Sequence, residues 1–119
     1  MKLEPRLYEL TTETLMPNLE ENLRYTITHA QRCVQEEDLR RLFPVLDHPA
    51  LQGCTLQHRR RDLESISYTL VCTARDTQGH ASWQLGKQQL RGTLEVRLGG
   101  KNMTFSQRVH ARALGPCSR

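Results

Sequence analysis

The stretch CTLQHRRRDLESISYTLVC, residues 54–72, carries the pattern that indicates how this chain folds. It begins and ends on cysteine, and apolar and polar residues alternate on both sides of a polar segment at residues 62–64. Alternation with a period of two is typical of β-strands, and a short polar segment between two such runs is typical of a hairpin. The stretch therefore predicts a β-hairpin with these facing residues: Leu56 with Leu70, His58 with Tyr68, and Arg60 with Ile66.

The same hairpin places Cys54 opposite Cys72. Directly opposed residues on antiparallel strands have Cβ atoms about 4.5–5.5 Å apart, and disulfides need roughly 3.5–4.5 Å, so a small adjustment allows a bridge. Four cysteines permit three connectivities. Only the pairing of Cys54 with Cys72, and hence of Cys33 with Cys117, uses the hairpin geometry, and we expect these two disulfides.

A metal site is the alternative interpretation of the same cysteines, because His29-x3-Cys33 and Cys54-x3-His58 resemble a set of zinc ligands. Residues four apart share one face of a helix, but on a strand they lie about 13 Å apart, too far for zinc bonds of about 2.0–2.3 Å. Both segments are predicted strands, and no C-x-x-C redox motif is present. We therefore expect no metal and no cofactor.

The rest of the chain continues the two-residue period, with one interruption. Residues 6–16 and 23–34 are predicted strands, the second with Leu23, Tyr25 and Ile27 on one face. The spacing i, i+3, i+4, i+7 of an amphipathic helix then appears, at Leu39, Leu42, Phe43 and Leu46. A proline at position 44 limits this helix to about two turns.

Further turns are predicted at residues 76–79, 86–89 and 99–102. They set strands side by side with these facing residues: Cys72 near Trp83, Leu70 near Leu85, Val96 opposite Phe105, and Leu98 opposite Met103. We expect one domain over residues 1–119, mostly β (α+β). Its predicted architecture is a curved antiparallel meander of about six to seven strands with one short amphipathic helix, stapled by two disulfides.

One face of this sheet collects more apolar side chains than a two-turn helix, about 11–12 Å long, can cover. They are Leu56, Leu70, Trp83, Leu85, Leu90, Leu94, Val96, Leu98, Met103, Phe105 and Val109. Either the sheet curls and fills the gap, or a groove survives between Phe43 and the patch of Trp83, Val96, Met103 and Phe105. These five residues are the candidate contacts for a ligand or partner.

Charge is distributed unevenly along the chain. Residues 1–38 hold 8 acidic and 4 basic side chains, whereas residues 39–119 hold 5 acidic and 13 basic ones. The two parts can attract each other within one fold, or a basic surface can meet an anionic partner. The run at residues 58–61, HRRR, alternates between faces and forms no continuous stripe, so we expect a solvated hairpin tip, dispensable for folding, and no nucleic-acid binding. No apolar run reaches the ~18 residues of a membrane span.

The assembled pattern is similar to that of a bacterial family, the domain of unknown function 3617. The similarity rests on RLYELTTET at residues 6–14, RCVQEEDL at 32–39, the Cys54 to Cys72 hairpin, GTLEV at 92–96 and RALGPC at 112–117, and covers roughly residues 5–117. This chain has Gln35 where a helix-capping Thr is expected. The resemblance implies export to the periplasm behind a cleaved signal that is absent here, oxidised cysteines, and no established activity.

Catalytic motifs are missing from the sequence. It has no G-x-S-x-G turn, no phosphate-binding loop and no paired acid/base motif, so we expect a protein that is not an enzyme. Two hypotheses remain. The first is a periplasmic binding or interaction module, expected to be a monomer, that uses the sheet or its edges to hold a protein partner. The alternative is a carrier of a small apolar ligand in a groove between the sheet and the short helix.

Overall fold

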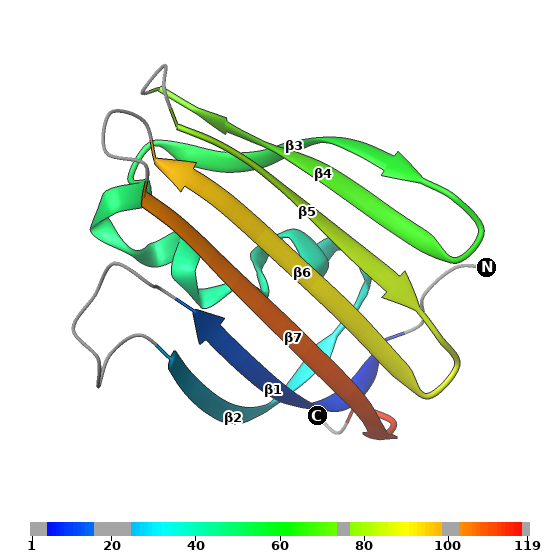
Figure 1. The fold of residues 1–119 in the computed structure, drawn as a ribbon. Helices are drawn as coiled ribbons and strands as arrows, with labels where there is room; N and C mark the ends of the chain where they lie inside the picture. Colours follow the sequence, from blue (N-terminus) through cyan, green and yellow to red (C-terminus); the bar gives the residue numbers. More distant parts are fainter. Residues whose placement is uncertain (1–4, 16–24, 74–76, 99–102, 118–119) are drawn as a thin grey trace.

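Seven antiparallel strands form one sheet in the computed structural model, which describes residues 5–15, 25–73, 77–98 and 103–117, with only the backbone of Tyr25, Ala50 and Met103. The strands are β1 (Arg6–Leu15), β2 (Tyr25–Val34), β3 (Cys54–Arg61), β4 (Ser65–Cys72), β5 (Gln78–Leu85), β6 (Gln89–Leu98) and β7 (Met103–Gly115). Their order across the sheet is β2-β1-β7-β6-β5-β4-β3 (Figure 1). The predicted mostly-β antiparallel class is confirmed.

The sheet consists of a meander extended by an N-terminal hairpin. Strands β3 to β7 follow one another as neighbours, and β1 then pairs with β7 while β2 pairs with β1. The last strand of the chain is therefore interior, and the two edges are β2 and β3.

Among the described residues, three short 3-10 segments cover one face of the sheet (Figure 1). They are η2 (Glu36–Arg41), η3 (Pro44–Asp47) and η4 (Pro49–Leu51). The amphipathic pattern correctly located the covering segment, but the predicted two-turn helix was wrong. Phe43 precedes Pro44, and a residue before proline is disfavoured in the α region; its φ of −96° and ψ of 102° are extended and separate η2 from η3.

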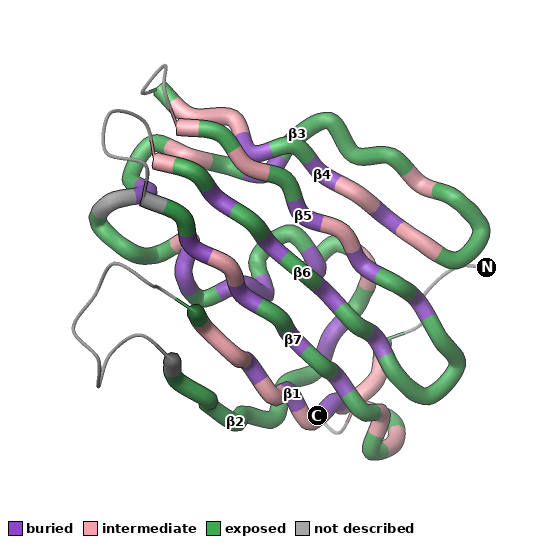
Figure 2. Tube along the Cα trace, viewed as in Figure 1, coloured by how far each residue is buried: buried purple, intermediate pink, exposed green. Residues whose placement is uncertain are grey.

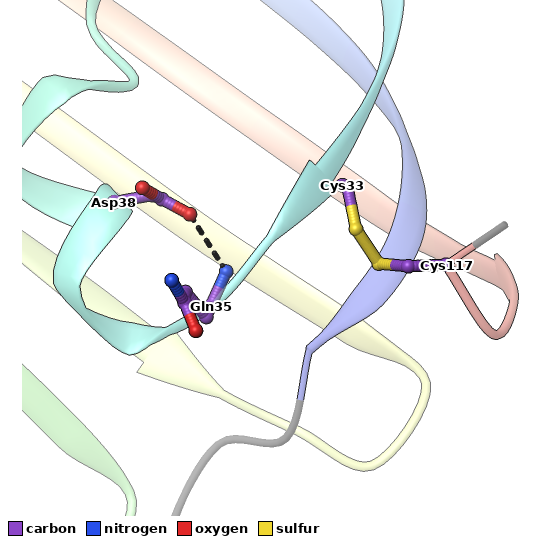
Figure 3. The surroundings of a disulfide bond; sticks show 4 residues. All are labelled: Cys33, Gln35, Asp38 and Cys117. Carbon is purple, nitrogen blue, oxygen red and sulfur yellow. Dashed lines mark hydrogen bonds between the residues drawn. A yellow bond between two sulfur atoms is a disulfide. The ribbon is translucent and has the colours of Figure 1, made fainter. Parts of the chain in front are cut away.

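The start of η2 does not depend on a threonine. The backbone N–H of Gln35 donates to the Asp38 carboxylate at 2.9 Å, beside the Cys33–Cys117 disulfide (Figure 3). A carboxylate in the first turn accepts a hydrogen bond from one backbone N–H, and its negative charge interacts favourably with the helix dipole. Asp38 thus supplies the half of a capping box that belongs to the third helical residue, and Gln35 occupies the N-cap position where the Thr was expected.

The core lies between the 3-10 segments and the predicted apolar face of the sheet. The side chains assigned to that face are buried, apart from the partly buried Leu98 and from Met103, whose side chain lies outside the described residues. At its centre the indole of Trp83 lies over Gly92, where an added Cβ would stand 2.7 Å from three indole atoms. Arg91, Thr93 and Glu95 point to the opposite, exposed face, as alternation requires.

Register was predicted correctly at the ends of the hairpins and wrongly in two places. Leu56 faces Leu70 and Val96 faces Phe105, as predicted, and Leu85 faces Leu90 across the predicted turn at residues 86–89. In β3, however, a bulge at residues 58–59 pairs Arg60 with Ser67 and Arg61 with Ile66. A bulge inserts one extra residue and shifts every later residue by one position.

The second error concerns β5. Leu70 faces Gly79, and Trp83 faces Ile66 rather than Cys72. Gly79 belongs to the strand and not to a turn: a Cβ there would lie 2.6 Å from the Glu95 carbonyl oxygen, so the glycine permits a close approach of β6. The predicted turn at 99–102, the start of the turn at 76–79, and Leu23 lie outside the described residues.

Both predicted disulfides are confirmed. Cys54 and Cys72 are direct partners in the β3–β4 ladder, with Cα atoms 4.0 Å apart. Cys33 of β2 is bonded to Cys117 beyond β7, with Cα atoms 5.6 Å apart (Figure 3). Both bridges therefore involve an edge strand, and they remove the thiolates on which the alternative zinc set depended.

Candidate functional site

The patch predicted to bind a ligand is closed core. Phe43 and Trp83 are 1% and 0% exposed, with ring centroids 5.3 Å apart, and the Trp83 Nε1–H donates to the Leu39 carbonyl at 3.0 Å. Val96 and Phe105 are also buried. The expected groove between Phe43 and Trp83 is thus filled by side chains, and curling of the sheet around the 3-10 segments is the outcome seen.

The basic run at residues 58–61 is exposed at residues 58–60, as predicted, but two of its arginines also bind η2, which the sequence did not predict. The bulge separates its members: Arg59 and Arg61 both form ion pairs with Glu36 of η2, the second at 3.3 Å, whereas Arg60 faces Ser67. Only 15% of the Glu36 side chain and 20% of the Arg61 side chain are exposed. The run therefore joins the β3–β4 hairpin to η2.

The space that remains between the sheet and the 3-10 segments is a cleft of about 890 Å³, which we call the arginine cleft. Its walls are β3 residues 54–58 and the η2–η3 segment, and Arg32 of β2 also lines it. The lining residues outside β3 are Arg32, Arg40, Arg41, Phe43, Leu46 and Asp47. Both edge strands contribute to this one cleft, so the sheet curls toward a barrel without closing.

A second depression of about 680 Å³, the sheet groove, crosses strands β4 to β7 and reaches Leu15 of β1. Its lining includes the outward-facing His80, Glu95, Arg97 and Thr104. Val96 and Phe105 also line this groove, but their side chains are buried on the other face of the sheet. They therefore contribute backbone to the floor of the groove. The side chains that line the sheet groove are therefore mainly polar ones of the exposed face.

Two tyrosines of the core have perturbed acidity. Burial raises the pKa of Tyr8, although the charge of Arg6 opposes the shift. Burial likewise raises the pKa of Tyr68, with Arg59 and Arg40 acting in the opposite direction. Both phenols are therefore held neutral, and neither is prepared to act as a base at neutral pH.

Gln107 is a structural residue that the sequence reasoning missed. It is 3% exposed; its Oε1 accepts from the Val45 backbone N–H at 3.2 Å, and its Nε2 donates to Thr14 Oγ1 at 2.7 Å. These bonds connect β7 to η3 and β1. The alternation of apolar and polar residues could have indicated that Gln107 is buried, because position 107 lies on the same face as Phe105 and Val109.

The two edge strands differ in how they are protected. In β2, residues 26–33 are all exposed on both faces, and ten consecutive pairs join it to β1 without a register shift. In β3, the bulge breaks the ladder and the arginines bind Glu36. Bulges and charged side chains are the usual devices that prevent an edge from pairing with another strand, and β2 has only Arg32 as a full charge.

Comparison with known proteins gives one match. The family model DUF3617, described as a protein of unknown function, matches residues 3–117. No curated protein and no solved structure matches the chain. Two disulfides are typical of an oxidising compartment outside the cytosol. In the described ranges, no helix has the length and apolarity needed to cross a membrane.

Proposed function

The chain belongs to the DUF3617 family of proteins of unknown function, and we propose that it acts as a non-enzymatic interaction module of the periplasm. In this proposal, the outer edge of β2 pairs with an extended segment of a protein partner. The single observation that carries it is the open edge of β2, which is exposed on both faces and has a strand neighbour only at β1 among the described residues (Figure 2).

An exposed, regular edge strand offers a row of backbone donors and acceptors to another chain. Adding a strand to such an edge is a common mode of peptide recognition, in which backbone hydrogen bonds provide affinity and alternate side chains provide specificity. The side chains of β2 suit this mode, because β-branched Thr26, Ile27 and Thr28 favour an extended partner. The Cys33–Cys117 bridge anchors the end of the strand.

The described histidines support a role without catalysis. His29 contacts Thr11 Oγ1 at 3.3 Å, His110 contacts Gln89 at 2.7 Å, and His80 lies 3.9 Å from Glu95 on the open face. The last two side chains are 69% and 67% exposed, where water screens their interaction. In the part of the chain that the structure describes, none of these three histidines is hydrogen-bonded to a serine or a cysteine.

The proposal can be tested with a photo-crosslinking residue placed at Gln31 of β2, with Gln57 of β3 as the matched control. Both positions are exposed glutamines on edge strands. After irradiation of the exported protein in cells, we expect a discrete adduct with another protein from position 31 and none from position 57. Ala30→Lys should remove the adduct, because a charge on the edge opposes strand addition.

Binding of the identified partner should then be reconstituted with its extended segment, and hydrogen exchange should show new protection of the β2 amides. Equal adducts from both positions, no adduct at all, or an adduct that persists in Ala30→Lys with unchanged circular dichroism would overturn the proposal. An adduct with a second copy of the chain would replace the expected monomer with a self-associating protein and would likewise refute the partner assigned here.

A further inference from the structure

The arginine cleft combines features that the β2 edge lacks, and it lies at a different site. Its lining comes from β2, from the η2–η3 segment and from β3. A volume of about 890 Å³ falls within the range of small-molecule sites, roughly 300–1,000 Å³. The inference that follows does not depend on the edge-pairing function.

The charge of the cleft is strongly one-sided. Arg32, Arg40 and Arg41 line it and are exposed, and none of the three forms an ion pair with a carboxylate of the described ranges. By contrast, Arg59 and Arg61 are paired with Glu36, and Arg112 is paired with Glu9. Asp47 is the one acidic residue in the described lining. Guanidinium groups bind carboxylates and phosphates in a bidentate manner, so this cleft favours an anion.

The inner part of the cleft is apolar. Phe43 and Leu56 line it although their side chains are 1% and 3% exposed, which places them at its base. Leu46 is partly buried and also lines it, as does Cys54 of the hairpin disulfide. A fully hydrated inorganic ion gains nothing from such a base, whereas an acyl or aryl group does, at about 25 cal/mol per Å² of apolar surface removed from water.

The wall of the cleft formed by β3 contains one residue in an unfavourable backbone conformation. His58 has a φ of 55°, and no other non-glycine residue of the described chain has a positive φ. Such a conformation costs on the order of 1–3 kcal/mol, and strained residues of this kind gather at ligand sites. His58 lies in the bulge and lines the cleft, and the next residue, Arg59, binds Glu36.

We propose that the arginine cleft binds an amphiphilic carboxylate, a single acyl chain with an acidic group. Arg32, Arg40 and Arg41 hold the carboxylate at the rim, and the chain lies against Phe43, Leu46 and Leu56. The ligand thus contacts Phe43 from the arginine cleft, whose lining does not include Trp83.

Decanoate is the probe, titrated into the disulfide-bonded protein by calorimetry. Decyl glucoside, with the same chain and no charge, and butyrate, with the same charge and a short chain, are the matched controls. We expect both controls to bind at least tenfold more weakly than decanoate, and the decanoate affinity to fall as salt is raised. Equal binding of decyl glucoside would overturn the assignment of the arginines, and equal binding of butyrate would overturn the apolar base.

Arg40→Gln with Arg41→Gln should weaken decanoate binding at least tenfold, and Asp47→Asn should strengthen it about twofold. Arg91→Gln with Arg108→Gln, on the exposed face of the sheet, removes the same charge and should change the affinity less than twofold. If the first double variant does not fold, Arg32→Gln on β2 gives the same test with one charge. Decanoate affinity that is unchanged by the cleft variants, or lowered equally by the sheet-face variants, would refute the proposal.

Discussion

Gly92→Ala tests the packing on which the centre of the core depends. The new methyl group would stand 2.7 Å from the Trp83 Cδ2, Cε2 and Cζ2 atoms, a separation that real Cβ atoms do not show. The indole is 0% exposed, contacts Phe43 and donates to Leu39, so it cannot move without loss. Either the ring shifts or the β6 backbone does.

The expected destabilisation is about 2 kcal/mol. Overpacking a core typically costs about 1–3 kcal/mol, and a displaced indole also loses a hydrogen bond worth about 0.5–1.5 kcal/mol. The change from glycine to alanine offsets about 0.4–1 kcal/mol by restricting the unfolded chain. Overpacking is therefore the largest contribution and determines the sign.

Urea unfolding followed by circular dichroism measures this difference, with the slope of the transition checked for constancy. Arg91→Ala, at the neighbouring exposed position, should stay within about 0.5 kcal/mol of wild type. In a Trp83→Phe background the smaller ring should reduce the cost of Gly92→Ala by at least half, because the two positions are coupled. A cost below about 0.5 kcal/mol, or the same cost in both backgrounds, would refute the reasoning.

Three more outcomes are expected. Replacing Cys33 and Cys117 by serine should destabilise the folded protein by about 4.6 kcal/mol, and replacing Cys54 and Cys72 by about 3.2 kcal/mol. The difference arises because the entropy of the closed loop grows with the separations of 84 and 18 residues. Denaturant titrations in which loss of the hairpin bridge costs more would contradict this. Glu36→Gln should cost about 1–2 kcal/mol, because it leaves Arg59 and Arg61 unpaired by that carboxylate, while the exposed neighbour Glu37→Gln should change stability by less than about 0.5 kcal/mol. Because the folded-state pKa values of Tyr8 and Tyr68 are raised, the stability they contribute should be present below the unfolded pKa of about 10 and be lost as pH rises through the folded values. In a rapid alkaline titration, Tyr8 and Tyr68 should ionise only as the protein unfolds, as phenolate absorbance would report; ionisation of both near pH 10 in folded protein would count against burial as the cause.

Local patterns determined most of the fold. Alternation identified the β-rich class, and two cysteines at the ends of one hairpin gave the register from which both disulfides followed. The hairpins at residues 85–90 and 96–105 were also predictable, because their turns are short and each strand has one apolar face. These features require only neighbours along the chain.

The errors arose where the conformation of a residue depends on a contact with a residue far along the chain. Alternation does not encode an extra residue, so the bulge at His58 was invisible, and with it the ion pairs that Arg59 and Arg61 make with Glu36, 23 and 25 positions away. Gly79 was assigned to a turn because glycine is common in turns, but the residue is a glycine because the Glu95 backbone lies too close to leave room for a side chain. The arginine cleft draws on β2, η2, η3 and β3, so its charge and its apolar base could not be seen together in any one stretch.

The pairing of β1 with β7 has a consequence for how the chain acquires its structure. Their paired residues are about a hundred positions apart, as with Glu9 and Arg112, so β1 cannot pair with its inner neighbour until the chain has been synthesised through β7. A lone two-stranded hairpin is marginally stable in water, and long-range strand pairing is slow because loop closure comes before any gain. The meander from β3 to β6 can assemble early, whereas the N-terminal hairpin docks last and is then secured by the bridge from Cys33 to Cys117. Oxidation of that cysteine pair thus marks the completion of folding.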